Sequence, residues 1–359
     1  MYKKITEKSF LFFFAAFVCL LALGIFFKPA DAVAAIVTGL KNCYYKVIPA
    51  LFPFFIVTAL VMNTPLKNIF GFVFLPYTRL LKINTPAAAS TLLLGFLGGF
   101  AVAGKSIDIL YRTNQINEKQ AALLLCCCVG AGPSFVISSV GYLMFNNLKI
   151  GIFLFLSLTL ASLFTGVLMK FVLGNTAEAV SWHEPQNDSR SYSSVFTGAV
   201  AGAVDSSLII CAYVTLFTYI LAVLPLPKQG VTALFCTIFL EVTNGCISAA
   251  QFGNIYWCVG ALSVLGCSVF LQLRALVSEN ISLMPLAVSR FIHLPFSISI
   301  CWLFLRLFPQ EISASANFSS EVLQEHFSLP PDLCLLLFVF AAVVAYEIMP
   351  NKVFTNTKK

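Results

Sequence analysis

The sequence predicts an all-α polytopic membrane protein, and three observations support this fold class. Of the 359 residues, 59% are hydrophobic and 10% are charged, whereas soluble domains are about 25% charged. Apolar runs of about 20 residues, long enough for a helix to cross a bilayer, recur along the chain. The polar and apolar alternation of a membrane β-barrel does not occur. We expect about eight spans plus two re-entrant or broken helices.

The charges and the cysteines fit this class. The formal net charge of +7 comes mostly from Lys and Arg in short loops and at the termini, where they orient membrane proteins. We therefore expect the lipid bilayer as a partner and no nucleic acid. The 12 cysteines lie mostly in apolar segments without metal-site spacing, so we expect small buried hydrophobic residues, no metal and no cofactor.

Ten apolar segments are expected to enter the membrane. They are residues 9–27, 47–62, 86–104, 120–145, 150–173, 195–224, 231–250, 255–273, 285–308 and 333–348. The first is longer than the core of a signal peptide, so we expect an uncleaved span. Residues 28–45 are expected to form an amphipathic connector, and residues 66–83 an interfacial helix.

Lysines near both ends predict cytoplasmic termini in a multi-pass membrane protein. Segment 86–104 contains four glycines and has basic loops on both sides, so we expect a re-entrant hairpin. A hairpin that enters from the opposite side fits the interrupted segment 231–250. This topology places Lys28, Lys41 and Lys46 outside, against the positive-inside rule.

A polar stretch, residues 175–194, divides the chain into two halves of similar order. Each half opens with an apolar segment and continues with an interrupted one. Halves that enter from opposite sides would form an inverted repeat, whose interrupted segments meet at the solute site in secondary transporters.

A polar run inside the second interrupted segment is the strongest candidate site. Glu241 is costly at membrane depth, where an ionisable residue by default indicates function. At the tip of a broken helix, Glu241, Thr243 and Asn244 can bind the polar groups of a solute. The structural alternative is an ion pair of Glu241 with Arg274 or Arg290. Glu241 is also a candidate proton-coupling group, which makes a coupling ion a candidate partner.

Gly132, Pro133 and Ser134 interrupt segment 120–145 and are the next candidates. Pro133 removes a backbone donor, so the helix is expected to unwind there and free carbonyl groups for a solute. A proline kink stabilised by neighbouring helices is an equal alternative.

Lys105 and Asp108 follow the first expected hairpin and are candidate gate residues, paired at the membrane interface. Residues 99–106 match the phosphate-binding pattern G-x-x-x-x-G-K-[ST] by letter. The segment before them is a membrane helix, whereas the phosphate-binding loop follows a strand, so we exclude an NTPase.

Asp205, Gln272, Arg290 and His293 are further candidates for a polar cavity. Arg290 and His293 lie one helical turn apart and so share a helix face. The alternative is that these side chains pair with one another inside the bundle, for example Asp205 with Arg290. The sequence has no Ser/His/Asp arrangement, so we expect no enzyme.

Several short motifs, in order from about residue 44 to 305, are similar to those of a known family. The most specific is Leu240-Glu241-Val242-Thr243-Asn244-Gly245, and the others are residues 48–55, 95–105, 132–133 with Gly141, 271–272 and 290–293. The chain resembles the YlbJ-like sporulation integral membrane proteins, which carry nucleoside-recognition (Gate) domains. The resemblance implies a multi-pass protein of a bacterial cell (inner) membrane, with two Gate-like units and the handling of nucleosides or related solutes.

The residues and the resemblance together predict five parts. They are an anchor and connector (1–43), a first Gate-like unit (44–174), a linker (175–194), a second Gate-like unit (195–308) and a loop, last span and basic tail (309–359). We expect a permease for a small polar solute, with nucleoside-like compounds as the first candidates, a link to sporulation and a homo-oligomer as a candidate assembly. The alternative is a non-transporting component of sporulation or of the envelope.

Overall fold

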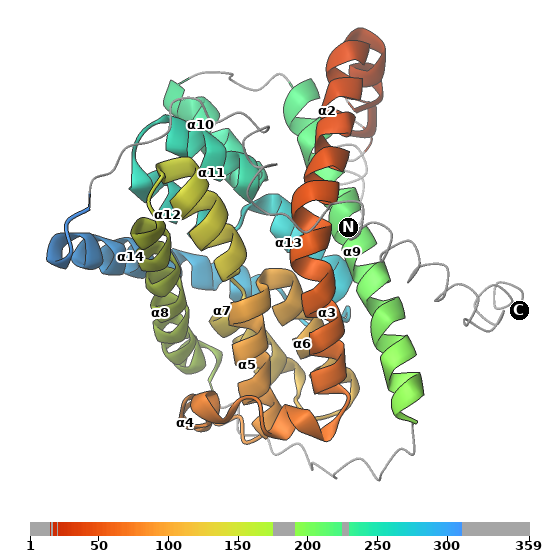
Figure 1. Cartoon of the computed structure of the whole chain (residues 1–359), viewed down its shortest axis with the longest axis vertical. Helices are drawn as coiled ribbons and strands as arrows, with labels where there is room; N and C mark the ends of the chain where they lie inside the picture. Colours follow the sequence, from red (N-terminus) through yellow and green to blue (C-terminus); the bar gives the residue numbers. More distant parts are fainter. Residues whose placement is uncertain (1–14, 16, 20, 175–190, 225–229, 311–359) are drawn as a thin grey trace, which may run out of the picture.

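The structure, a computed structural model, describes residues 15, 17–19, 21–174, 191–224 and 230–310. Every regular element in these ranges is helical, which confirms the predicted all-α fold (Figure 1). Most of the expected linker and all of the expected last span lie outside the described residues.

The first half of the chain contains α-helices together with short 3-10 and π-helices. These elements are α2 (Pro29–Asn42), η1 (Cys43–Val47), α3 (Ile48–Met62), η2 (Pro65–Asn68), η3 (Phe72–Phe74), α4 (Leu75–Leu80), α5 (Pro86–Gly98), α6 (Phe100–Arg112), α7 (Glu118–Cys128), η4 (Ser134–Met144) and α8 (Leu148–Leu173). The second half contains α9 (Tyr192–Val223), α10 (Gly230–Leu240), α11 (Val242–Gln251), α12 (Ile255–Val264), α13 (Gly266–Leu276) and α14 (Met284–Leu307).

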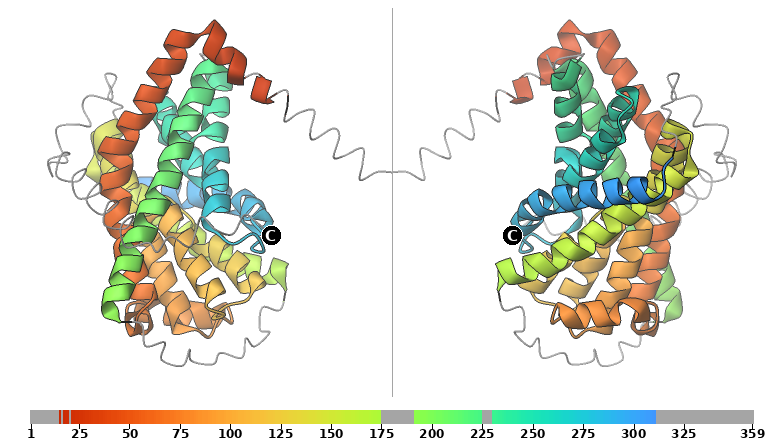
Figure 2. Two further views of the ribbon diagram at one scale, coloured as in Figure 1. Left: turned by 90° about the vertical axis from the view of Figure 1, so that its right-hand side faces the viewer. Right: turned by 90° about the vertical axis from the view of Figure 1, so that its left-hand side faces the viewer.

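Several of these helices can cross a membrane. Within the described residues, four helical stretches are long and apolar enough: α8, α9, α12 together with α13, and α14. The number rises to six if each of two sharply bent helix pairs counts as one span. Helix α14 packs along α8, and Figure 2 shows both running across the direction of α9. The total of eight spans stays a prediction.

The structure describes both expected connecting segments, and the interfacial helix differs from the prediction. The expected connector, residues 28–45, is helical and continues through η1 into α3, because the joining residues Cys43 and Ile48 keep right-handed helical geometry. The expected interfacial helix, residues 66–83, is divided into η2, η3 and α4, with the non-helical Gly71 before η3.

The two interrupted segments form helical hairpins, as the glycines and polar residues predict. Helices α5 and α6 turn back on each other at Gly99, whose positive φ of 82° suits glycine. Helices α10 and α11 turn at Glu241, and Gly245 lies against the backbone of Ile238. Figure 1 shows the two hairpins at opposite ends of the bundle. Their sides of the membrane stay a prediction.

Two further helices are broken beside the hairpin turns. Residues 129–132 separate α7 from η4, and a side chain at Gly99 would lie 3.0 Å from the backbone nitrogen of Gly132. Leu265, with a φ of 71°, separates α12 from α13, although the sequence predicts an unbroken span there. A side chain at Gly266 would lie 3.2 Å from the carbonyl oxygen of Ile238. Each hairpin turn therefore lies against the break of another helix.

Apart from α2, η1, η2, η3 and α4 of the first half, both halves share one order of elements: an apolar helix, a hairpin, a broken helix and a long helix. The first set is α3, α5–α6, α7–η4 and α8, and the second is α9, α10–α11, α12–α13 and α14. This order is consistent with two related units. Their inversion across the membrane and the predicted domain boundaries stay predictions.

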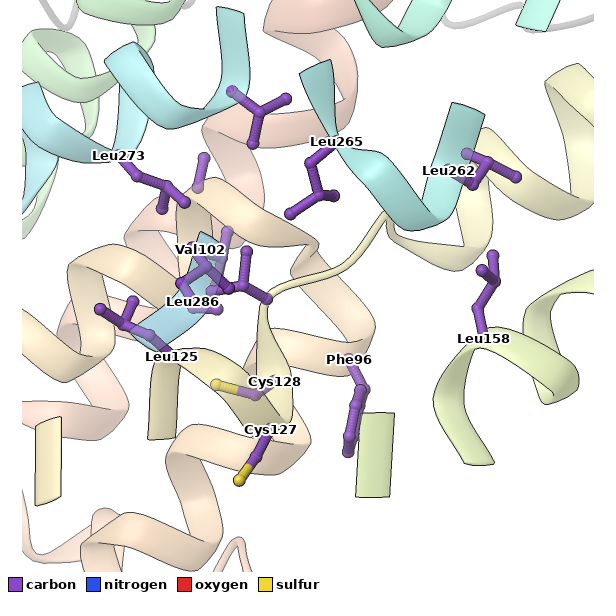
Figure 3. Packing of buried hydrophobic residues seen from close by; sticks show 14 of the residues in the cluster. Phe96, Val102, Leu125, Cys127, Cys128, Leu158, Leu262, Leu265, Leu273 and Leu286 are labelled. Atoms are coloured by element: carbon purple, nitrogen blue, oxygen red, sulfur yellow. The ribbon is translucent and has the colours of Figure 1, made fainter. Parts of the chain in front are cut away.

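Residues from both halves form one hydrophobic core around these breaks (Figure 3). Cys126, Cys127 and Cys128 are fully buried in it at the end of α7. Each thiol donates to the carbonyl oxygen four residues earlier, at 3.0–3.2 Å. The prediction that these cysteines act as small buried residues is confirmed.

Two glycine substitutions test the close packing of the second hairpin. In Gly245→Ala, the added methyl group would lie 2.9 Å from Cα of Ile238, so we expect a loss of about 1–3 kcal/mol in stability. In the control Gly198→Ala on α9, the methyl group meets nothing within 4 Å, and better helix propensity predicts a gain of about 0.5–1 kcal/mol. Thermal unfolding of both purified variants measures the difference. Equal shifts would contradict the hairpin geometry.

Candidate functional site

The four helix breaks enclose a cavity of about 150 Å³. Each break contributes to its wall: Gly99 from the first hairpin, Gly132 from the break after α7, Glu241 from the second hairpin and Leu265 from the break before α13. Irregular backbone at membrane depth is tolerated where it is buried in protein or lines a cavity. The convergence of four such places makes this cavity the candidate solute site.

Six of the candidate residues from the sequence line the cavity. They are Gly132, Ser134, Glu241, Thr243, Asn244 and Gln272. It also contains residues that sequence reasoning did not select, among them Phe100, Phe135 and Thr218. The two aromatic residues follow the breaks at Gly99 and Gly132, so their position after a glycine or Gly-Pro interruption was the available signal. Nothing in the sequence marks Thr218.

Glu241 forms the N-terminal cap of α11. The side chain is 3% exposed, and its two oxygens accept the backbone N–H groups of Thr243 at 3.0 Å and Asn244 at 2.7 Å. A carboxylate in this place satisfies otherwise unpaired helix donors and complements the positive end of the helix dipole. The carboxylate therefore shapes the site, and it has fewer free lone pairs for a solute than the sequence suggests.

The structural alternative of an ion pair between Glu241 and an arginine is not formed. Arg274 donates instead to the carbonyl oxygens of Val277, Ser278 and Ile281, in the turn that follows α13. The second arginine in that alternative, Arg290, also binds carbonyl oxygens and lies outside the cavity.

The remaining cavity wall offers one free acceptor and several helix N-termini. Gln272 is 2% exposed, and its Oε1 atom has no hydrogen-bond partner among the described residues. Helices α6, η4 and α13 begin at the cavity without a side-chain cap, at Gly99, Pro133 and Leu265. The first N–H groups of a helix have no partner within it and carry a partial positive charge. The cavity wall is mostly apolar, with residues such as Leu51, Phe100 and Val214, and these helix starts place a few donors beside Gln272 in it.

Arg290 and His293 lie together behind the first break. Arg290 is 5% exposed and donates to the carbonyl oxygens of Val129 at 3.4 Å and Cys126 at 3.3 Å, at the C-terminal end of α7. A cation in this place complements the negative end of the α7 dipole. Nε2 of the buried His293 lies 3.1 Å from the hydroxyl of Ser162. Neither residue lines the cavity, and both hold its first half in place.

The other candidates lie apart from the cavity. Asp205 is exposed on α9, so it forms neither the predicted cavity wall nor the pair with Arg290. Asp108 is buried and pairs with Arg112 at 2.8 Å rather than with Lys105. Its Oδ1 atom also accepts the N–H group of Ser278 at 2.8 Å and its hydroxyl at 2.6 Å. Asp108 thus ties the first half to the second, and a gate role for it and Lys105 stays a prediction.

Comparison with known proteins gives one relative. The sporulation integral membrane protein YlbJ of Bacillus subtilis (strain 168) is 26% identical over 156 residues, which cover 44% of this chain and 38% of that protein. The expected YlbJ-like resemblance is confirmed. The chain is an integral membrane protein related to YlbJ, although the match spans less than half of either protein. No family model and no solved structure matches, and the Gate-like units stay a prediction.

The cap at Glu241 makes a measurable contribution to stability. In Glu241→Ala, two buried N–H groups lose their acceptor, so we expect a loss of about 1–2 kcal/mol. In the control Asn254→Ala, the lost cap of α12 is exposed and water can replace it, so the loss should be smaller. Thermal unfolding of both purified variants gives the comparison. A loss at Glu241 no larger than that at Asn254 would contradict the buried cap.

The contacts of Arg290 predict that its positive charge stabilises the fold, so lysine should replace it better than leucine. Arg290→Leu leaves two buried carbonyl groups without a charged donor, and we expect a loss of about 1.5–3 kcal/mol in stability. Arg290→Lys keeps the charge at the end of α7 and should lose less. Chemical rescue provides the measurement. Millimolar guanidinium chloride should raise the unfolding midpoint of Arg290→Leu by more than it changes the midpoint of wild type. Equal midpoints for the Leu and Lys variants would contradict a role for the charge.

Proposed function

We propose that this protein is a permease for a small polar solute and binds the solute in the cavity at the four helix breaks. The protein would act in the bacterial cell membrane with both termini in the cytoplasm, as the Lys and Arg distribution predicts. Its similarity to a sporulation integral membrane protein supports a role in sporulation.

The observation that carries this proposal is the convergence of the breaks from both halves on one cavity. Secondary transporters bind solutes near the bilayer midplane, between repeats, where discontinuous helices leave backbone groups free. The cavity here has this composition, with Gly99 and Gly132 from the first half and Glu241 and Leu265 from the second. A protein that only anchored other proteins would not need a cavity of this kind.

The wall of the cavity is mostly apolar, and its few polar groups favour a small solute with one electron-rich or anionic group. The uncapped N-termini of α6 and η4 supply donors and partial positive charge, while Glu241 occupies the N-terminus of α11. Gln272 supplies an acceptor for a donor group of the same molecule. We therefore place small carboxylates beside nucleoside-like compounds as first candidates.

The volume of the cavity limits the size of the solute that it can hold. Its volume of about 150 Å³ is below the roughly 300–1,000 Å³ that is usual for ligand sites. A whole nucleoside would require the hairpins to move apart, whereas a smaller solute fits with less movement. The non-transporting alternative rests on the name of the relative, and we propose no enzymatic activity.

Uptake by the full-length protein in proteoliposomes tests the proposal. The panel contains labelled nucleosides, small carboxylates and other polar metabolites, with empty liposomes as background. We expect uptake of at least one compound by wild type and a roughly three- to tenfold reduction in Gln272→Leu, the effect of one hydrogen bond of about 0.5–1.5 kcal/mol. The matched control is Gln115→Leu, because Gln115 is also buried with an unpaired Oε1 atom but lies outside the cavity.

One result would reject transport, and another would reject the cavity as the binding site. One is wild-type uptake at background for the whole panel, together with normal sporulation of cells that carry Glu241→Gln. The other is equal reduction by Gln272→Leu and Gln115→Leu, which would show that the cavity does not bind the transported compound.

A further inference from the structure

A second and larger hollow lies beside the cavity. It has a volume of about 580 Å³ and lies between α2 and α9 on one side and α10 and α11 on the other. We call it the polar groove, because Thr38, Thr218, Thr237, Asn244, Ser248 and Gln251 line it. Together with Asp31 at the start of α2, these residues give each of the four helices at least one polar side chain in the groove, beside apolar residues such as Leu221 and Leu234.

The threonines show how these polar side chains are bonded. The hydroxyl groups of Thr38, Thr218 and Thr237 each donate to the carbonyl oxygen four residues earlier in the same helix, at 2.7–2.8 Å. This bond satisfies the hydroxyl hydrogen and leaves lone pairs on the oxygen. Such acceptors can be hydrated along the groove without a partner from another helix.

Helix α10 separates the polar groove from an apolar face. Phe235 and Phe239 are 56% and 62% exposed, and neither lines the groove. Thr237, two residues from each, lines it. Polar residues at membrane depth normally face the bundle interior or a water-filled cavity. This division indicates lipid on the aromatic face of α10 and water on the threonine face.

The groove meets the cavity at two residues. Asn244 and Thr218 line both hollows. The backbone of Asn244 is held by Glu241, so its position follows the cap of α11. A solute that passed along the groove would therefore reach the cavity at Asn244 and Thr218.

Helices α6 and α13 are in close contact beyond the part of α6 that borders the cavity. A side chain at Gly104 would lie 2.8 Å from Leu273. Further along α6, Asp108 bonds to Ser278 and Arg112. The molecule thus has a polar hollow beside the cavity and bonded contacts further along α6.

We infer that the polar groove is a water-filled vestibule through which the solute enters and leaves the cavity, with Asn244 and Thr218 at its inner end. This inference rests on the proposed permease function. It makes the α10–α11 hairpin the element that separates the vestibule from the cavity.

Thiol labelling in membrane vesicles tests whether the groove contains water. A membrane-impermeant cationic methanethiosulfonate reagent is applied from each side to Thr237→Cys, Ser248→Cys and Phe239→Cys, and modification of the new thiol is measured on its peptide. The first two should react about tenfold faster or more than the third, because a charged reagent needs water to reach a thiol. Equal or slower reaction at Thr237→Cys and Ser248→Cys would overturn the vestibule whatever the uptake result.

A steric block tests the route. Ser248→Trp should reduce uptake by about tenfold or more, whereas Phe239→Trp, on the aromatic face of α10, should leave it unchanged. Gln251→Trp serves as a second blocking variant, and unfolding midpoints show that each variant is folded. Normal uptake by both folded blocking variants would overturn the route and leave the permease proposal in place. Absence of wild-type uptake would reject the permease and the route together, while fast labelling would still show a hydrated groove.

Discussion

The fold depends on one constraint, which is that backbone groups released from a helix inside the membrane must find partners within the protein. The chain places each hairpin turn against the break of another helix, so the irregular backbone is buried in protein or borders the cavity. Glycine makes this approach feasible: Gly99 lies close to Gly132, and Gly266 lies close to Ile238. Both crossings border the same cavity. The proposed solute site therefore lies where the helix breaks meet.

The two buried charged residues near these contacts stabilise helix ends and do not pair with each other. Glu241 accepts two N–H groups at the positive end of α11, and Arg290 donates to two carbonyl groups at the negative end of α7. Each charge opposes the partial charge of a helix end. Since neither group needs the other as a counter-ion, the two crossings can move relative to one another without breaking an ion pair.

The sequence allows a reliable prediction of the breaks that carry glycine, proline or polar residues. The hairpins at Gly99 and Glu241 and the gap before Pro133 belong to this class, because those residues weaken a helix locally. The break at Leu265 could not be predicted, since contact of the next residue with α10 holds a leucine in left-handed geometry. The sequence could not predict the carbonyl partners of Arg290 either, because they come from a distant part of the chain.

The structure changes which groups we propose for solute recognition. The sequence assigns it to the Glu241 carboxylate, but the cap uses both oxygens of that group. Recognition then falls to Gln272, to the side chains of Thr243 and Asn244, and to the uncapped ends of α6 and η4. Because the cap belongs to the same hairpin that borders the polar groove, movement of α10 and α11 would carry Glu241 with it. The charge on the α11 terminus would stay neutralised, while the free N-termini of the first half became open or closed to the solute.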